Sequence, residues 1–422
     1  MKRCIILVLA VFVLFGAFFA NALARESLHV QLILSSQAIT YIQENIVPEF
    51  EAKYDVSVLI EPVGWDNRFE KVLISTAAGV PPDIFMNGAE HVLELVEAGV
   101  VYAIDREWET WEDRHDFFPA SLGSSTWQGH RYGVPIYTGP RIWWFRKDLF
   151  EQAGLDAERP PNSWDGLLDA AKRLTRTEAD RVVRQGYDLS RWNPGDVFAG
   201  TQDYTVFLWQ AGGELVDPET YEPLFYSPQG SETLQFLINL RDAVQPPGYQ
   251  SALPEGSGSP FFRGASAIYL AGGWVASEVY TLQPDLAEVI GAIDPPLGYR
   301  HQVSAVFSDW LAIHSQSPNK ELAWRFIQEL TAPDVLVDIN LRTGLLSPRR
   351  STVEIFAEAN PLTRFLYASM DYMRPFPVFP RSQELLGVLH REYAQAMAGT
   401  RGIESALEEA ARLWRSLLAE QR

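Results

Sequence analysis

Short apolar segments alternate with longer segments of helical periodicity along the first hundred residues. Residues 28–35 and 56–63 are apolar runs of strand length, and residues 82–86 form a third. Between the first two runs, apolar residues recur at steps of three and four, as on one face of a helix: Ile39, Ile42, Ile46 and Phe50. Strands that alternate with helices predict a mostly parallel sheet covered on both faces. The pattern therefore indicates an α/β fold.

This regular pattern breaks at residues 138–140, a Thr-Gly-Pro segment. Proline lacks a backbone donor and glycine admits unusual dihedral angles, so a strand that reaches this point is interrupted. A second, aromatic strand is predicted at residues 142–145, followed by a short helix that Gly154 ends. Ser163 is then placed to cap the next helix. The predicted order is strand, break, strand, short helix and capped helix.

The residues around this break resemble a known family. Residues 132–135 read YGVP, residues 145–156 read FRKDLFEQAGLD, and residues 160–164 read PPNSW. Residues 262–274 contain FRGASAI and then GGW. Together these passages resemble the extracellular solute-binding proteins that serve ABC importers, in the carbohydrate-binding family that includes maltose-binding protein. One departure is the Phe-Arg pair that opens the second passage, where the family usually has Tyr-Asn.

The resemblance implies a two-lobed periplasmic-binding-protein fold of the α/β class, in which each lobe is a mostly parallel sheet flanked by helices. The chain would cross between the lobes near residues 137–140, 287–292 and 344–347, so each lobe is discontinuous in sequence. The expected division is residues 1–24 for a signal peptide, 25–138 with 291–345 for the first lobe, and 139–290 with 346–422 for the second.

The first 24 residues predict a secretion signal. Lys2 and Arg3 precede an apolar run over residues 5–20, and residues 22–24 read Ala-Leu-Ala, an A-x-A cleavage site. An uncleaved membrane anchor is the alternative, because this segment could nearly span a bilayer. The one cysteine, Cys4, lies within the signal rather than just after it, which disfavours a lipid anchor. We therefore expect a cleaved signal, a mature chain without cysteine and a periplasmic location.

Composition and charge narrow the class of protein further. The chain has 422 residues, of which 47% are hydrophobic and 21% charged, and this suits two globular domains. Its formal net charge of −19 would repel nucleic acid and anionic lipid. We expect no nucleic-acid partner, and we expect the chain to act as a monomer.

Candidate ligand residues follow from where the predicted strands end and where the family motifs fall. In α/β sheets, ligands lie beyond the carboxyl ends of the strands. Sugars present apolar C–H faces and hydroxyl groups, so their sites use flat aromatic rings and planar polar groups. The first lobe is expected to contribute Gln37, Trp65, Asn87, Glu90, Asp309 and Trp310, and the second lobe Arg141, Trp143 and Trp274.

Each candidate has an alternative reading. Trp274 is the preferred stacking residue, because the tryptophan of the resembled GxW motif recurs in sugar sites. Core burial is the alternative for every tryptophan of the set, and a solvated loop position is the alternative for the polar residues. Trp143 and Trp144 would point to opposite faces of a strand, so one of them is expected to pack in the core. Arg141 could instead pair with a carboxylate or phosphate on the ligand.

Catalytic motifs do not accompany these residues. The sequence lacks G-x-S-x-G, H-E-x-x-H, a Walker loop and G-x-G-x-x-G, and its seven histidines show no metal-ligand spacing. We therefore expect no enzyme, no cofactor and no metal. A glycosidase needs only two carboxylates, so a secreted carbohydrate-active enzyme is the second hypothesis. A periplasmic adaptor that recognises proteins is the third.

The favoured interpretation is a periplasmic protein that captures a carbohydrate or polyol between its lobes. It would deliver this ligand to the transmembrane subunits of an ABC permease. Ligand contacts to both lobes would favour a closed form by their differential affinity. In this resemblance ATP hydrolysis belongs to separate subunits.

Overall fold

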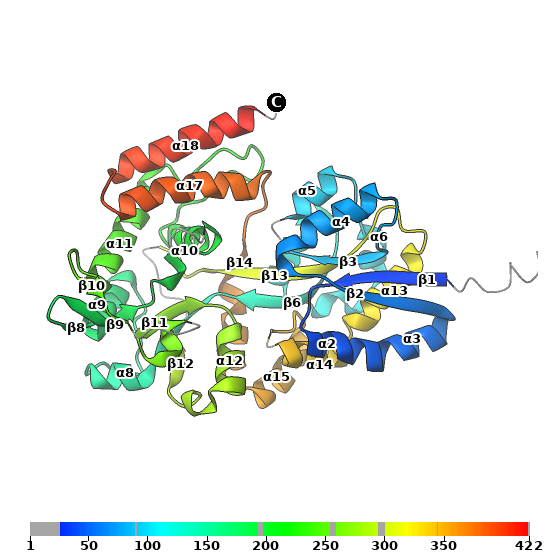
Figure 1. The fold of residues 1–422 in the computed structure, drawn as a ribbon, viewed down its shortest axis with the longest axis horizontal. Coiled ribbons are helices and arrows are strands. Elements are labelled where there is room, and N and C mark those ends of the chain that lie inside the picture. The colour runs from blue at the N-terminus through cyan, green and yellow to red at the C-terminus, as the bar shows by residue number, and fades with distance from the viewer. Residues whose placement is uncertain are drawn as a thin grey trace, which may run out of the picture.

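Two β-sheets with helices on both faces form two lobes that lie side by side (Figure 1). The computed structural model describes residues 26–88, 91–192, 197–253, 259–293, 300–343 and 345–420. The expected signal peptide, residues 1–24, lies outside these residues. Within the described part of the chain, no helix combines the length and the apolarity needed to cross a membrane. The two-lobed α/β class predicted from the sequence is confirmed.

The first sheet defines the first lobe. Its strands are β1 (Glu26–Leu32), β2 (Val56–Pro62), β3 (Ile84–Asn87), β6 (Val134–Pro140), β13 (Ser304–Ile313) and β14 (Met373–Pro375). Their order is β14-β13-β3-β1-β2, and β6 also pairs with β13. β1 is parallel to β2 and β3, whereas β13 is antiparallel to β3 and β6.

The second sheet defines the second lobe. Its strands are β7 (Ile142–Arg146), β8 (Arg176–Glu178), β9 (Arg181–Tyr187), β10 (Gln250–Ser251), β11 (Ser266–Ala271) and β12 (Ile290–Ile293). Their order is β10-β9-β11-β7-β12, with β8 paired to β9. β9 is parallel to β11, whereas β7 is antiparallel to β11 and β12. A separate hairpin joins β4 (Thr126–Trp127) to β5 (His130–Arg131).

Both sheets are mixed rather than mostly parallel, because the chain passes between the lobes within them. A strand that enters a sheet from the other lobe runs away from the junction. β7 is therefore antiparallel to β11, and β13 is antiparallel to β3. The middle crossing also differs from the expectation at residues 287–292. Those residues lead into β12, which pairs with β7 in the second sheet, and the chain returns to the first lobe along β13.

The antiparallel pair of β6 and β13 joins the two lobes. Ala305, near the start of β13, packs in the core of the second lobe, whereas Leu311 and Ile313 pack in the core of the first. The register of the pair shifts between Asp309 and Trp310, which leaves one extra residue, Ile136, on β6. The Asn340 side chain donates to the Ile136 carbonyl at 3.0 Å, so the bulge is satisfied.

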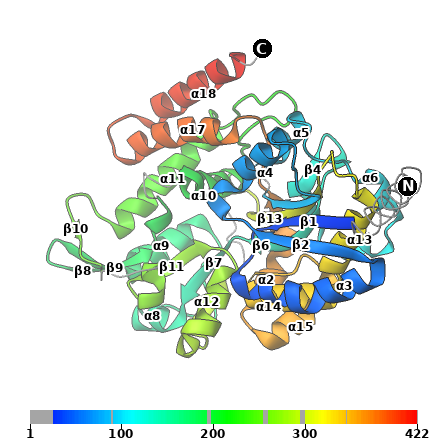
Figure 2. The same ribbon diagram turned by 45° about the vertical axis from the view of Figure 1, so that its right-hand side comes forward.

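Helices cover each sheet on two sides. Those of the first lobe are α2 (Ser36–Tyr41), α3 (Val47–Tyr54), α4 (Arg68–Ala77), α5 (Val92–Glu97), α6 (Asp105–Thr110), α7 (Pro119–Leu122), α13 (Lys320–Leu330) and α14 (Pro333–Thr343). Figures 1 and 2 show α4 and α5 on one face of the first sheet and α2, α3 and α14 on the other. The buried apolar residues of these helices form two clusters, one on each face.

The second lobe has a similar arrangement. Its helices are α8 (Lys147–Gln152), α9 (Trp164–Leu174), α10 (Val197–Gln210), α11 (Pro228–Val244), α12 (Trp274–Leu282), α15 (Val353–Ala359), α16 (Thr363–Ala368), α17 (Ser382–Met397) and α18 (Ile403–Ala419). One core contains α9, α10, α11, α17 and α18, and the other contains α12, α15 and α16. The local signals read from the sequence are confirmed. The Ser163 hydroxyl accepts from the Gly166 N–H at the start of α9, and Gly154 has φ of 68° after α8.

Gly186 lies where strand and helix pack most closely, so even a substitution by alanine should disturb this packing. A Cβ built on Gly186, in β9, would lie 1.7 Å from the carbonyl oxygen of Ala171 on α9. We expect Gly186→Ala to destabilise the protein by about 1–3 kcal/mol, because strand and helix must separate. Gly387→Ala, in α17 with no atom within 4 Å, should instead be neutral or stabilising by about 0.5–1 kcal/mol. Urea unfolding midpoints would measure both changes, and equal midpoints would contradict this account of the β9–α9 contact.

Candidate functional site

Strand ends from both sheets meet at the junction of the lobes. β1, β2 and β3 are parallel, so their carboxyl ends share one edge, and Trp65 follows the end of β2. In the second sheet, β11 ends at Ala271, which pairs with Ile142 at the start of β7. Arg141 and Trp274 therefore flank the same end of the second sheet. This edge-to-edge arrangement is where α/β proteins place ligands.

A tyrosine–aspartate pair forms the first-lobe side of the site. Tyr137 on β6 lies opposite Asp309 on β13, and its hydroxyl donates to Asp309 Oδ2 at 2.5 Å. Both side chains are buried. The Trp65 ring, 48% exposed, has its centroid 6.4 Å from that of Tyr137, and the Arg68 guanidinium lies 4.8 Å from the Trp65 ring. This side thus combines an exposed aromatic face with hydrogen-bonding groups.

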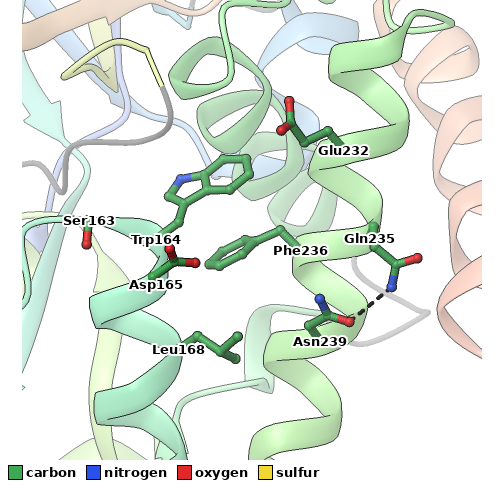
Figure 3. Close-up of a pocket in the computed structure, with 8 residues that line it drawn as sticks. All are labelled: Ser163, Trp164, Asp165, Leu168, Glu232, Gln235, Phe236 and Asn239. Atoms are coloured by element: carbon green, nitrogen blue, oxygen red, sulfur yellow. Dashed lines mark hydrogen bonds between the residues drawn. The ribbon is translucent and has the colours of Figure 1, made fainter.

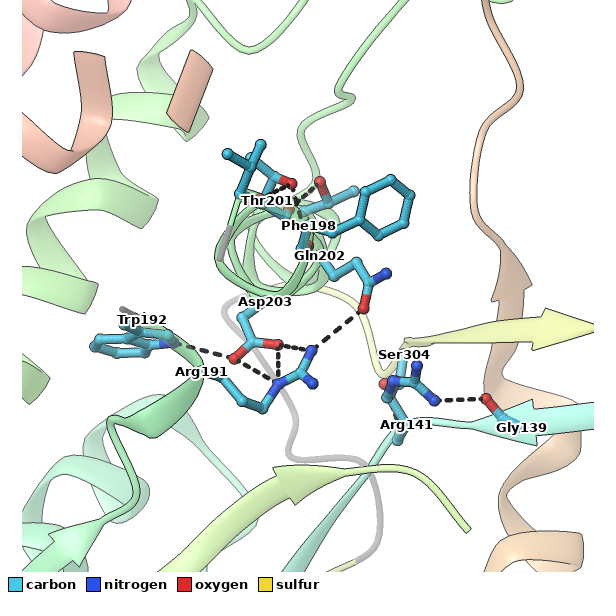
Figure 4. Close-up of polar contacts among 11 residues, drawn as sticks. Gly139, Arg141, Arg191, Trp192, Phe198, Thr201, Gln202, Asp203 and Ser304 are labelled. Atoms are coloured by element: carbon cyan, nitrogen blue, oxygen red, sulfur yellow. Dashed lines mark hydrogen bonds and ion pairs between the residues drawn. The ribbon is translucent and has the colours of Figure 1, made fainter. Parts of the chain in front are cut away.

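On the second-lobe side, Arg141 lies against two aromatic rings. Its guanidinium carbon is 4.6 Å from the centroid of Trp274 and 4.5 Å from that of Phe307. Its Nη1 donates to the Gly139 carbonyl at 3.2 Å (Figure 4). A Cβ on Gly272 would lie 2.2 Å from the Trp274 ring and 2.6 Å from Arg141 Nη1, so the stack requires glycine there.

Further aromatic rings continue from this stack along the second lobe. Phe307 stacks on Phe376 with centroids 5.5 Å apart, and Phe376 lies 6.3 Å from Phe198 of α10. These three phenylalanines line a narrow apolar recess together with residues of the segment before α17. The junction therefore offers a row of flat apolar faces that begins at Trp274.

A buried ion pair lies close to Arg141. Arg191 donates to Asp203 Oδ1 at 3.0 Å and to the Gln202 side chain at 3.2 Å (Figure 4). Trp192 Nε1 donates to the other oxygen of Asp203 at 3.0 Å. Because Gln202 and Asp203 lie on α10, this network fixes the helix against the strand ends of the second sheet.

Burial changes the protonation of two groups at the junction. It raises the pKa of Asp309 to about 7, although the hydrogen bond from Tyr137 and the charge of Arg68 act in the opposite direction. It also lowers the pKa of Arg141 to about 9, with a further contribution from the positive charge of Arg191. Groups that have lost this much water are suited to hold the hydroxyl or charged groups of a ligand.

The structure brings together four of the residues proposed from the sequence. Trp65 and Asp309 lie on the first-lobe side, and Arg141 and Trp274 lie on the second-lobe side. Gln37 is exposed at the start of α2, and its side chain contacts none of these four in the described structure.

Asn87 and Glu90 differ from these four. Asn87 is fully buried at the end of β3, where its Oδ1 accepts from the Gly88 N–H at 2.9 Å and lies 2.9 Å from His91 Nδ1. Its visible role is to hold the turn after the strand. Glu90 lies outside the described residues.

Two tryptophans expected in the site lie in hydrophobic cores. Trp143 is fully buried and its ring meets the edge of Phe207 on α10. Trp310 is also fully buried, and a Cβ on Gly133 would lie 2.4 Å from its ring. The expectation of ligand contact is therefore corrected for both. Trp144, on the opposite face of β7, is buried as well, because helices cover both faces of this sheet.

Sequence reasoning missed three residues of the site. Tyr137 was visible as the last aromatic residue before the break, and Phe307 lies two positions before Asp309, on the same side of β13. Arg68 follows Trp65 by three residues, a spacing at which helical side chains meet. These signals become informative only when the pairing of β6 with β13 is known.

A second recess lies away from the junction. Figure 3 shows this groove between α9 and α11, where Trp164 stacks on Phe236 with centroids 4.3 Å apart. It encloses about 400 Å³ and is open to solvent, but it belongs to the helical layer rather than to the strand ends. Among the described residues, no group of three metal-binding side chains comes together. The junction of the lobes is therefore the better candidate site.

A two-lobed chain with polar and aromatic residues at the junction is the architecture of a binding protein that holds its ligand between domains. Residues 35–336 match the model of the bacterial extracellular solute-binding protein family, and the chain belongs to this family. The membership in the solute-binding proteins of ABC transporters that the sequence predicted is confirmed. The glycosidase alternative finds no support in the family or in the relatives below.

Several relatives extend this result. A putative binding protein of Brucella abortus (strain 2308) is 24% identical over 375 residues, which cover 87% of each chain. The mannitol-binding protein of Pseudomonas aeruginosa is 26% identical over 270 residues, which cover 62% of this chain and 60% of that protein. The solved structure of the sugar-binding protein MalE of Xanthomonas citri has a TM-score of 0.80 at 20% identity and covers 94% of this chain and 98% of its own. That likeness shows the shared fold.

The buried Asp309 predicts a pH dependence of stability. An aspartate in the unfolded chain ionises near pH 4, whereas Asp309 ionises near pH 7 in the folded protein. The unfolded state therefore loses its proton first, and the free energy of unfolding should fall between about pH 4 and pH 7 by up to about 1.4 kcal/mol per unit. Asp309→Asn keeps an acceptor for the Tyr137 hydroxyl but cannot ionise, so its profile should lack this contribution. Urea unfolding across pH 4–8 would compare the two, and parallel profiles would contradict the assignment.

Proposed function

We propose that this protein captures a carbohydrate or polyol at the junction of its lobes. The observation that carries the proposal is the contact of Arg141 with the Trp274 and Phe307 rings, near the Tyr137–Asp309 pair. Aromatic faces suit the C–H faces of a sugar, and guanidinium and carboxyl groups suit its hydroxyls. The mannitol-binding and sugar-binding relatives support the same class of ligand.

Capture works by closure of the lobes about the crossing strands β6 and β13. Outside these strands, Trp127 of the β4–β5 hairpin stacks on Tyr221, with centroids 6.0 Å apart and planes at 20°. Trp127 packs against the first-lobe core and Tyr221 against the second. Tyr221 has φ of 61°, a left-handed conformation that costs a non-glycine residue free energy, and its carbonyl accepts from Trp414 Nε1 at 3.0 Å. This contact supports closure, because it can form only when the lobes approach each other.

The proposal includes a setting, which membership in the family supports. The mature chain acts in the periplasm as a monomer after its signal peptide is removed, and it delivers its ligand to the transmembrane subunits of a permease without chemical turnover. The lobes divide within β6 and β13 rather than at fixed loop boundaries.

A thermal-shift screen of residues 25–422 against sugars and polyols tests the ligand class. Ligand at a hundred times its dissociation constant should add about 2.7 kcal/mol of stability and raise the melting temperature. Trp274→Ala should weaken binding by at least about 2 kcal/mol, and Trp274→Phe, which keeps a flat ring, should weaken it less. If no carbohydrate or polyol stabilises the wild-type protein, the proposed ligand class is wrong.

The Trp127–Tyr221 contact gives a test of closure. We expect Trp127→Ala and Tyr221→Ala each to weaken ligand binding by about 0.5–1.5 kcal/mol, because an aromatic pair that holds the closed form is lost. The double variant should bind the ligand as tightly as either single variant, because each substitution removes the same contact. Tyr249→Ala, at an exposed tyrosine of the same lobe, is the control and should bind normally. Calorimetry would measure the affinities, and additive losses would argue against a shared contact.

A further inference from the structure

Arg141 differs in its partners from the three most deeply buried arginines among the described ion pairs. Three arginines whose side chains are at most 12% exposed pair with carboxylates: Arg146 with Asp148 at 2.8 Å, Arg191 with Asp203 at 3.0 Å, and Arg349 with Asp116 at 3.5 Å. Arg141 is half-buried, with its Nε shielded from solvent, and within the described ranges no carboxylate pairs with it. A buried charge without a counter-charge is costly, so its position at the junction calls for an explanation.

The contacts that Arg141 does make leave donors available. The guanidinium carbon lies over the rings of Trp274 and Phe307, and such cation–π contacts take up none of the hydrogen-bond acceptors that its N–H groups require. Nη1 donates to the Gly139 carbonyl. Nε is buried without a hydrogen-bond partner among the described residues, and Nη2 donates to none of them either. The rings thus lie against the guanidinium group while its Nε and Nη2 donors have no partner among the described residues.

The acids nearest to this part of the second lobe are already engaged. Asp203 accepts from Arg191 Nη2 and from Trp192 Nε1, each at 3.0 Å (Figure 4). Asp188 accepts from two serine hydroxyls at 2.8 and 2.6 Å. The charge of Asp203 still acts on Arg141, but neither acid accepts a hydrogen bond from it in the described structure.

The protonation of Arg141 agrees with this account. Burial, together with the positive charge of Arg191, lowers the pKa of Arg141 to about 9, although the negative charge of Asp203 acts in the opposite direction. The guanidinium group is still protonated at neutral pH, but its charged form is held at a cost in free energy. An anionic group placed against it would supply both the missing acceptor and the missing charge.

We propose that the solute carries a carboxylate or phosphate group, and that Arg141 receives this group at the junction of the lobes. The ligand class is then an acidic sugar or a phosphorylated polyol, whose hydroxyls and C–H faces meet the remaining residues of the site. The inference rests on the proposed function, since it requires that a polyhydroxylated solute binds here. A planar anion suits this residue because the guanidinium group offers parallel N–H donors.

Matched ligands test the charge separately from the sugar. The mature wild-type protein would be titrated by calorimetry with glucose, glucuronate and glucose 6-phosphate, with the galactose set, and with glycerol and its phosphate. We expect one anionic member to bind roughly 10- to 100-fold more tightly than its neutral counterpart. The uronate and phosphate members distinguish the two anions, and inorganic phosphate alone serves as the probe for the bare group.

Variants at Arg141 and a matched arginine locate the effect. Arg141→Met should remove the preference for the anionic member, and Arg141→Lys should keep part of it as a point charge. Arg131 is the control: its guanidinium lies 4.4 Å from the Trp108 ring, and its Nη1 donates to the Leu122 carbonyl at 3.3 Å, but it lies on β5 of the first lobe and outside the candidate site. Arg131→Met should leave the preference unchanged. If Arg141→Met does not fold, Arg141→Lys tests the role of Arg141, because it should weaken the binding of the anionic ligand more than that of the neutral ligand.

The outcomes separate this inference from the proposed function. A neutral sugar or polyol that binds as tightly as its acidic and phosphorylated forms would overturn the inference and leave the proposed function intact. Anion preference retained in both Arg141 variants would overturn the role of Arg141. A wild-type protein that binds no member of the panel would count against both proposals. If inorganic phosphate binds and no sugar or polyol part increases the affinity, the ligand is not a polyhydroxylated solute and both proposals are wrong.

Discussion

The antiparallel pairing of β6 with β13 is the constraint on which this structure depends. β13 contributes to the cores of both lobes and β6 to that of the first, and Asp309 pairs with Tyr137 midway along them, beside the bulge at Ile136. A pair of strands shared in this way keeps the lobes connected while it leaves only a narrow strip of backbone at the junction. Every group of the candidate site is positioned from this strip, either on the strands themselves or at the strand ends that point toward it.

The junction concentrates polar groups that have little access to water. Tyr137 and Asp309 satisfy each other, and the Arg191–Asp203 pair is completed by Gln202 and Trp192. Arg141 is the departure, since aromatic rings rather than an acid hold it. Aromatic rings can contact a guanidinium group without accepting hydrogen bonds from its N–H groups, so these donors stay available to a ligand. The same rings present apolar faces, so one stack serves both parts of an amphipathic solute.

Sequence reasoning succeeded where the signal was local. The helix cap at Ser163, the left-handed Gly154 and the break before Arg141 all depend on a few neighbouring residues. It was less successful with tryptophan, because aromatic side chains serve cores and ligand sites alike. Trp143 and Trp310 lie in cores, since each is covered by an element distant in sequence, whereas Trp65 and Trp274 remain at the junction. The position of the middle crossing was also mistaken, because strand pairing and not chain order assigns residues 290–293 to the second lobe.

The sequence by itself determined the family and the α/β class with two lobes, and it proposed four residues of the candidate site. These properties are encoded in short motifs and in hydrophobic periodicity, which each segment carries alone. Only the tertiary structure decided which tryptophans are buried, that Asp309 lies against Tyr137, and that Arg141 has aromatic neighbours but no acid among the described residues. Burial and charge pairing depend on contacts between segments more than a hundred residues apart, and the order of residues along the chain does not specify those contacts.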